Sequence, residues 1–177
     1  ARFPQFADVR EMIATTAKLD GGFSAALTLN ERGVADALEA GVDEMIFVVS
    51  ATEEHSLANT RRSRIEAVEM LARIDTQRKA AGAGAPVLTA GIAMAFGCSL
   101  SGPVDPTEVL RMAEACAKAG ADTVAVADTV GFGGPRQVAQ MARAKGRLDL
   151  LDQKATHTLD GRSFPNGAHV AEVVVDP

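Results

Sequence analysis

The sequence predicts a parallel α/β fold, and three observations support this prediction. Short apolar segments alternate with helical segments and are joined by short turns, which is typical of right-handed β–α–β units. The segment EMIFVVS, residues 44–50, is apolar throughout its centre, as expected for a parallel strand covered on both faces. Finally, EAGVDEMIFVVSAT and KAGADTVAVADTV repeat one order of helix end, Ala-Gly, Asp and strand, which indicates a recurring unit.

Each element is predicted from its own pattern. Strands are expected at residues 24–30, 44–50, 87–96 and 121–127, and helices at residues 31–41, 63–81, 105–120 and 134–145. Gly41 predicts a helix end of the left-handed type. Ser63 and Glu66, three residues apart, predict a capping box. Asp105 followed by Pro106 predicts an N-cap with proline in the first turn.

The last part of the chain reads differently. The alternation of strand and helix stops after residue 145, and residues 146–177 contain a turn cluster and one predicted strand at 168–175. We therefore predict an α/β domain over residues 1–145 and a divergent C-terminal segment over residues 146–177. The polar stretch between residues 50 and 63 is expected to be a loop.

Composition argues against several classes of partner. A net charge of −5 and the absence of Trp and Tyr disfavour nucleic acid. No apolar stretch reaches the roughly 20 residues that span a bilayer, and the first residues lack the apolar centre of a signal peptide. Cys98 and Cys116 have no metal-ligand spacing, which indicates reduced thiols in a cytosol-like compartment. Because the chain does not begin with Met, we expect further residues upstream.

Polar residues follow each predicted strand. Asn30 closes the first, and the segments SATEEH, GCSLSG and DTVG close the next three. Ligands of parallel α/β folds bind at the carboxyl ends of the strands, so we expect these segments to meet at one edge. Asp128 in DTVG has two interpretations of equal weight: a functional carboxylate at that edge, or a turn carboxylate bonded to nearby amides.

Other reactive side chains lie in the same segments. Glu53, Glu54 and His55 could serve as acid–base or metal groups, although three polar loop residues are more often solvated. Cys98 could be a nucleophile, but no histidine is fixed beside it in the sequence, which favours a structural thiol.

A basic group precedes the long helix. Arg61, Arg62 and Arg64 could bind an anionic ligand at the helix start, and an exposed basic face is the slightly favoured alternative. Asn59, just before them, could bond to a ligand or to the backbone.

Five segments occur in the order RFPQFAD, LTLNERG, SATEEHSLANTRRS, AMAFGCSLSG and ADTVGFGGP. Together they resemble the 3-hydroxy-3-methylglutaryl-CoA lyase family, within the metal-dependent TIM-barrel lyases and Claisen-condensation enzymes. The pattern S-A-[ST]-E-x-H-x-x-x-N-x-x-x-S at residues 50–63 and F-G-C-x-x-x-G at 96–102 favour the lyase over the synthases. The resemblance covers about residues 1–144.

The resemblance implies a (β/α)8 TIM barrel, of which this chain holds about four to five βα units. It implies cleavage of 3-hydroxy-3-methylglutaryl-CoA to acetyl-CoA and acetoacetate with a divalent cation, Mg²⁺ or Mn²⁺. In this retro-Claisen reaction a base removes the alcohol proton, the carbon–carbon bond breaks, and the enolate of acetyl-CoA is protonated. Asp128 matches the functional aspartate of the family and Asn59 a positioning asparagine. That Arg61 and Arg62 lie near the CoA end of the substrate is our own inference and not a family assignment.

The sequence also departs from the family. The expected Arg-Asp pair and a glutamate would precede residue 1, and of the later H-x-H motif His157 fits the first position while Leu159 replaces the second. His157 and His169 are too far apart for a same-helix pair. The metal ligands are therefore unknown. Three explanations account for the missing family residues. The sequence is incomplete, the product is truncated, or a partner chain completes the barrel. The first two are favoured.

Three hypotheses follow for function. The first is a lyase whose natural form has the whole barrel. The second is an inactive, oligomer-forming barrel remnant. The third is a related acyl-CoA Claisen-type synthase. An open part-barrel exposes sheet edges, so we expect homo-oligomers. We also expect the 177-residue polypeptide alone to bind Mg²⁺ weakly and to cleave no substrate. The expected location is the cytoplasm of a bacterium or the mitochondrial matrix of a eukaryote.

Overall fold

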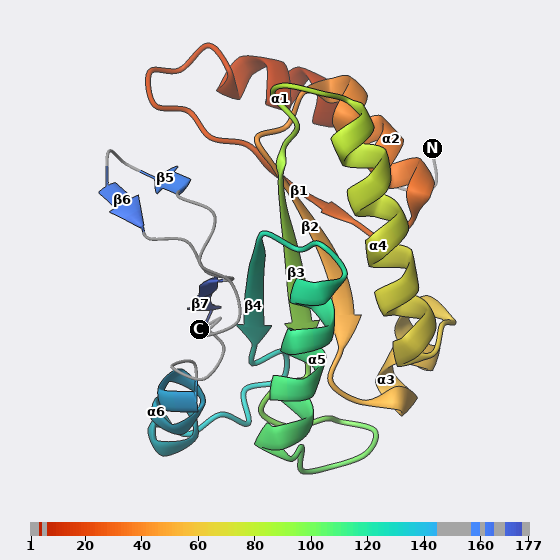
Figure 1. Ribbon diagram of the computed structural model, residues 1–177, viewed down its shortest axis with the longest axis vertical. Helices are drawn as coiled ribbons and strands as arrows, with labels where there is room; N and C mark the ends of the chain where they lie inside the picture. The colour runs from red at the N-terminus through yellow and green to blue at the C-terminus, as the bar shows by residue number, and fades with distance from the viewer. Residues whose placement is uncertain (1–3, 5–6, 145–156, 160–161, 165–168, 175–177) are drawn as a thin grey trace.

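The computed structural model describes residues 4, 7–144, 157–159, 162–164 and 169–174. From β1 to α6, strands alternate with helical connections along the chain (Figure 1). The strands are β1 Ala25–Thr28, β2 Glu44–Ser50, β3 Val87–Ala93, β4 Thr123–Ala127, β5 His157–Leu159, β6 Arg162–Phe164 and β7 His169–Val174. The helices are α1 Val9–Thr16, α2 Glu31–Ala40, α3 Glu53–Thr60, α4 Arg64–Ala80, α5 Pro106–Lys118 and α6 Pro135–Ala144.

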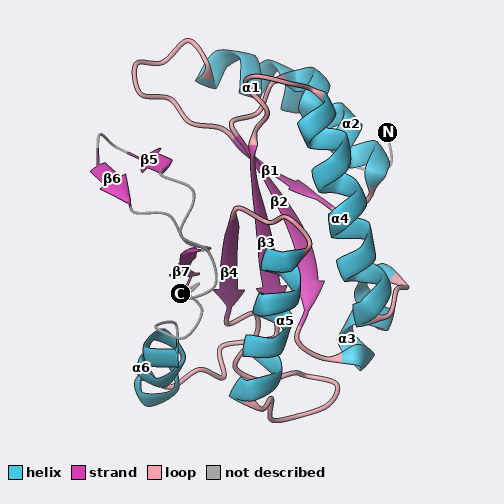
Figure 2. Ribbon diagram, viewed as in Figure 1, coloured by secondary structure: helices cyan, strands magenta, loops and turns pink. Residues whose placement is uncertain are grey.

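Five of these strands form one sheet in the order β1-β2-β3-β4-β7. Every neighbouring pair in it is parallel, so the predicted parallel α/β fold is confirmed. Helices α2, α4 and α5 run between successive strands and pack against the sheet (Figure 2). The strands β5 and β6 form a separate antiparallel pair.

The core lies between the sheet and these helices. Alternate residues of the central strands face it and are at most 2% exposed: Met45, Phe47, Val49, Leu88, Ala90, Ile92, Val124 and Val126. Leu71 and Ile74 of α4 and Val109 of α5 meet them from the helix side and are fully buried. The opposite face of the sheet is more open at its edge, where Leu27 of β1 is 65% exposed.

The repeated sequence unit forms the same local structure twice. Asp43 precedes β2 and accepts a hydrogen bond from the amide of Ser24 at 2.7 Å, next to β1. Asp122 precedes β4 and accepts one from the amide of Leu88 in β3 at 2.9 Å. Each aspartate therefore ties the start of its strand to the start of the preceding strand in the sheet.

The predicted helix starts are confirmed. Asn30 Oδ1 accepts from the amide of Gly33 at 2.9 Å and caps α2. Ser63 and Glu66 form the capping box of α4. Asp105 accepts from the amide of Thr107 and caps α5. These short-range signals depend only on neighbouring residues, so the sequence specifies them directly.

Two helices were not predicted. Helix α1 lies near the N-terminus, and α3 occupies most of the segment expected to be a loop, so that prediction is wrong over Glu53–Thr60. Helix α3 buries only Ser56, so its sequence has no apolar stripe that would reveal it. Thr52 caps it, two glutamates favour its first turn, and Arg61 ends it with φ of 58°.

The predicted C-terminal strand is present as β7, which pairs with β4. His157 lies in β5, outside the five-stranded sheet, so the strand beside β4 is not the one that carries His157. The boundary predicted at residue 145 and residues 146–156 lie outside the described residues, and that division stays a prediction. Among the helices in the described part of the chain, none has both the length and the apolar character needed to cross a bilayer.

Candidate functional site

The carboxyl ends of β1, β2, β3 and β4 lie at one edge of the sheet because these strands are parallel neighbours (Figure 1). Asn30, Glu53, Cys98 and Asp128 each follow one of these four ends, as the sequence predicted. We call the connections at this edge, residues 51–63, 94–105 and 128–134, the rim.

Two hydrogen bonds join neighbouring segments of the rim. Thr52 Oγ1 donates to Sγ of Cys98 at 3.3 Å and links the segments after β2 and β3. The amide of Met94 donates to Thr129 Oγ1 at 2.9 Å and links those after β3 and β4. Met94 has φ of 62°, a left-handed conformation that is costly for a residue with a side chain. The bond to Thr129 stabilises this turn and makes the rim continuous.

Cys98 is buried in the rim and its sulfur is surrounded by donors. Burial raises the pKa of this thiol, but hydrogen bonds from Ser101, Thr52 and the amide of Leu100 together outweigh it and lower the pKa to about 7. Cys116 in α5 is buried too, and there burial alone raises the pKa to about 12. Of the two thiols, Cys98 is therefore the one with thiolate character near neutral pH.

Asp128 organises the segment that follows β4. Its Oδ1 accepts from the amide of Phe132 at 2.9 Å and its Oδ2 from the amide of Gly133 at 2.8 Å. A Cβ atom at Gly133 would lie 2.8 Å from Oδ2 of Asp128, so a larger residue there would displace the carboxylate. Asp128 thus has the bonds of a turn carboxylate, and a direct part in catalysis stays a prediction.

Phe132 brings the segments after β3 and β4 into direct contact. A Cβ atom at Gly97 would lie 2.5 Å from Cδ2 of Phe132, which leaves no room for a side chain at that position. Phe132 is nevertheless 54% exposed. Phe132 therefore covers Gly97 while about half of its surface stays open to solvent.

The acidic and histidine side chains after β2 are more engaged than the sequence suggested. Nδ1 of His55 lies 2.8 Å from Oγ of Ser50, the buried last residue of β2. Burial lowers the pKa of His55, so its imidazole is neutral at neutral pH. Glu53 Oε2 accepts from the amide of Arg64 at 2.9 Å. Glu53 and Glu54 are both exposed, as expected of solvated side chains, and the expectation is wrong only for His55, which is half-buried.

The predicted substrate-binding residues lie at the end of α3. Asn59 and Arg61 are exposed there. Arg62 instead turns toward β1, and its Nη1 donates to the carbonyl oxygen of Leu29 at 3.2 Å. The structure therefore separates Arg62, which contacts the backbone, from Asn59 and Arg61, and a role of any of the three in substrate binding stays a prediction.

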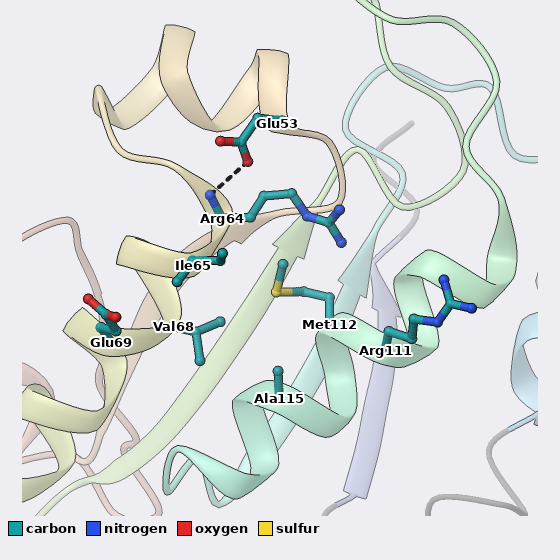
Figure 3. A pocket seen from close by; sticks show the side chains of 8 residues that line it. All are labelled: Glu53, Arg64, Ile65, Val68, Glu69, Arg111, Met112 and Ala115. Atoms are coloured by element: carbon teal, nitrogen blue, oxygen red, sulfur yellow. Dashed lines mark hydrogen bonds between the residues drawn. The ribbon is translucent and has the colours of Figure 1, made fainter.

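A cavity of about 460 Å³ lies between α4 and α5 (Figure 3). Apolar side chains of both helices line it together with two arginines and two glutamates: Ile65, Val68, Met112, Ala115, Arg64, Arg111, Glu53 and Glu69. Nη1 of Arg64 pairs with Glu108 at 3.3 Å, and its Nε is buried without a partner in the described residues. Asp128, Cys98 and His55 do not line this cavity, which meets the rim at Glu53.

The described residues do not fit a divalent cation. Within them, no three His, Cys, Asp or Glu side chains lie close enough together to hold a metal ion. Both carboxylate oxygens of Asp128 already accept backbone amides.

Sequence reasoning missed the residues that connect the rim. Thr52, Thr129 and Ser50 are common in turns and were read only as parts of longer motifs. A weak signal exists, because Thr52 and Thr129 each stand two residues after the last residue of a strand. Their partners come from other segments, and a single sequence does not identify them.

The comparisons with known proteins agree with this arrangement. The sequence profile of the family described as HMGL-like matches residues 3–156. The chain belongs to the HMGL-like family.

Hydroxymethylglutaryl-CoA lyase YngG of Bacillus subtilis is 30% identical to this HMGL-like chain over 138 residues, which are 78% of this chain and 45% of the relative. The mitochondrial hydroxymethylglutaryl-CoA lyase of Arabidopsis thaliana is 31% identical over 92% of this chain and 35% of its own length. The (R)-citramalyl-CoA lyase of Chloroflexus aurantiacus is 35% identical over 67% of this chain and 36% of its own length.

Solved structures place this HMGL-like chain within a TIM barrel. The HMG-CoA lyase of Brucella melitensis matches with a TM-score of 0.71 and 31% identity, over 80% of this chain and 49% of that one. An HMG-CoA lyase of Acinetobacter baumannii, in complex with coenzyme A and 3-methylmalate, matches with a TM-score of 0.73 and 27% identity. The match covers 82% of this chain and 46% of that one. The chain thus spans less than half the length of these relatives, and the predicted partial barrel is confirmed.

Proposed function

We propose that the natural protein with this sequence is an acyl-CoA carbon–carbon lyase that cleaves 3-hydroxy-3-methylglutaryl-CoA to acetyl-CoA and acetoacetate. The main support is the rim, in which the bonds Thr52–Cys98 and Met94–Thr129 join three family motifs at the carboxyl ends of parallel strands. This is where enzymes of this barrel fold place their reacting groups.

The substrate class rests on the named relatives. One solved relative was obtained with coenzyme A, and the curated relatives act on CoA thioesters by their names. The first candidate is 3-hydroxy-3-methylglutaryl-CoA, because several of the relatives bear that name. The second candidate is (R)-citramalyl-CoA, because the relative with that name is 35% identical over the matched part.

The rim gives each candidate residue a different proposed part. Asp128 shapes the segment after β4 through two amide bonds and so sets the position of Phe132. Asn59 and Arg61 are exposed and free of the core, as groups that contact the CoA portion should be. Dependence on Mg²⁺ or Mn²⁺ rests on the family resemblance alone, since the described residues hold no group of three candidate ligands.

The remaining proposals concern the state of the protein. We propose a homo-oligomer, since strand β1 pairs on one side only among the described strands. We propose that the protein is located in the cytoplasm if it is bacterial. If it is eukaryotic, we propose the mitochondrial matrix, because a plant relative is named mitochondrial.

The experiment is a substrate comparison with the full-length natural protein. Acetoacetate release from 3-hydroxy-3-methylglutaryl-CoA is followed by coupled NADH oxidation, and CoA products from (R)-citramalyl-CoA by chromatography, with and without Mn²⁺. We expect a higher kcat/KM for the first thioester. A preference for (R)-citramalyl-CoA supports the second candidate. Condensation of acetyl-CoA with a keto acid, without cleavage, identifies a synthase, and no turnover of any thioester identifies an inactive protein.

A further inference from the structure

Helix α3 is held at its first turn by contacts to the end of β2 and to the segment that follows β3. Its N-cap Thr52 donates to Cys98 after β3 at 3.3 Å. His55 in the first turn places Nδ1 2.8 Å from Oγ of Ser50, which ends β2 and is 1% exposed. The start of α3 is therefore fixed by side chains that reach back into the sheet.

The chain beyond α3 is fixed to a third strand. The helix ends at Arg61, whose left-handed conformation, with φ of 58°, reverses the chain. Arg62 then donates from Nη1 to the carbonyl oxygen of Leu29, the residue directly after β1, at 3.2 Å. Together with the contacts of the first turn, this bond ties the 52–62 segment to the end of β2 and to the segments that follow β1 and β3.

These contacts matter because α3 has no apolar face to hold it. It is 8 residues long and buries only Ser56. A helix this short is marginal by itself in water, and it lacks the apolar face that normally docks a helix. Its placement at the rim therefore depends on polar contacts: those of His55, Thr52 and Arg62, and the bond from the Arg64 amide to Glu53 at 2.9 Å.

We propose that His55 and Arg62 are positioning residues that fix α3 on the rim and thereby present Asn59 and Arg61 to the CoA portion of the substrate. The proposal rests on the acyl-CoA function proposed above. It assigns Arg62 a different part from the one the sequence suggested, because its guanidinium acts through the Leu29 carbonyl and not through the substrate.

A positioning role affects binding more than chemistry. When a contact is lost, α3 samples other placements, and the substrate must reorder it on binding. That cost appears in KM, while the reacting groups elsewhere on the rim are unchanged and kcat is retained. Loss of one ordinary hydrogen bond corresponds to a change of about three- to tenfold in affinity.

The test compares matched variants of the full-length protein with 3-hydroxy-3-methylglutaryl-CoA as substrate. We expect His55→Ala to raise KM about three- to tenfold with kcat within about twofold, and His55→Asn, which keeps an amide near Nδ1, to restore KM. Arg62→Ala should raise KM likewise. Arg62→Gln should restore it, because an uncharged amide can still donate to Leu29. Ala58→Gln, an exposed change on α3 between two good helix formers, is the control.

Three results overturn the proposal: an unchanged KM in His55→Ala, a loss of kcat at constant KM, or a failure of Arg62→Gln to restore binding, which would indicate contact with an anionic ligand. If the wild-type protein turns over no CoA thioester, the proposed function fails. The contacts are then tested by hydrogen exchange of the α3 amides. Faster exchange in His55→Ala and Arg62→Ala than in Ala58→Gln retains the positioning role, and equal exchange overturns it.

Discussion

Thr52 donates a hydrogen bond to the sulfur of Cys98 across 46 positions of sequence, and this contact joins the segment after β2 to the segment after β3. A second contact, from Met94 to Thr129, spans 35 positions and adds the segment after β4. Residues that the sequence places in separate turns thus form one surface at the carboxyl edge of the sheet. The proposed lyase site depends on this surface.

The contact between Phe132 and Gly97 predicts a specific packing defect. Gly97→Ala places a methyl group within 2.5 Å of the Phe132 ring, so we expect a loss of about 1–3 kcal/mol in the free energy of unfolding, as for other overpacked sites. Urea denaturation measures it. In a Phe132→Ala background the same change should cost little, because the ring is gone. An equal cost in both backgrounds contradicts the contact.

Asp128→Asn tests the carboxylate that orders the segment after β4. The amide keeps one acceptor but turns an NH₂ group toward the second backbone N–H, so we expect a loss of about 1–3 kcal/mol of stability. In the full-length protein we expect kcat to fall by more than the unfolded fraction explains, because Phe132 and its neighbours shift at the rim. An unchanged kcat would reduce Asp128 to a structural turn residue.

The ion pairs at the opposite end of the sheet provide a stability prediction unconnected with the site. Arg78 is buried and bonds to Asp75 at 2.7 Å, to Asp122 and to the carbonyl of Pro86. Arg78→Met removes the buried cation, while Asp75 keeps Lys79 at 2.6 Å and Asp122 keeps the amide of Leu88. We therefore expect a loss of about 3 kcal/mol, at the low end for a broken buried pair. Arg73→Met, which breaks an exposed pair with Glu31, should cost about 0–1 kcal/mol. Equal thermal shifts for the two variants contradict this assignment.

Local signals in the sequence predicted most of the fold. Strand β2 was predicted at its observed bounds because its apolar run is continuous, and α4 because Ser63 and Glu66 form a capping box. Helix α3 was missed because polar contacts hold it in place and an apolar stripe is absent. Periodicity detects buried faces, so a helix without one gives no signal.

The site was predicted in location but not in its connections. The parallel strands place four residues at one edge of the sheet, independently of their side-chain contacts: Asn30, Glu53, Cys98 and Asp128. The bond from Arg62 to Leu29 depends on where the end of β1 lies, and no pattern near Arg62 contains that information. Contacts of this kind depend on the packed structure and not on local spacing.

The lowered pKa of His55 predicts a contribution to acid sensitivity. The unfolded chain takes up this proton near pH 6.5, whereas burial lowers the pKa in the folded protein. Between the two values the unfolded state binds more protons, so the free energy of unfolding falls as the pH is lowered through this range. Denaturation at pH 7.5, 6 and 5 should show a steeper loss for wild type than for His55→Asn. Parallel losses contradict the assignment.

The state of the Cys98 thiol reports most directly on whether the segments of the rim meet. The 177-residue chain has two cysteines and neither Trp nor Tyr, so thiolate absorbance near 240 nm has little background. We predict one thiolate titrating at about 7, absent in Cys98→Ser, and the second at about 12. Thr52→Val should raise the first pKa, since it removes one donor, while Thr129→Val should not. An identical first pKa in wild type and Thr52→Val would contradict the account.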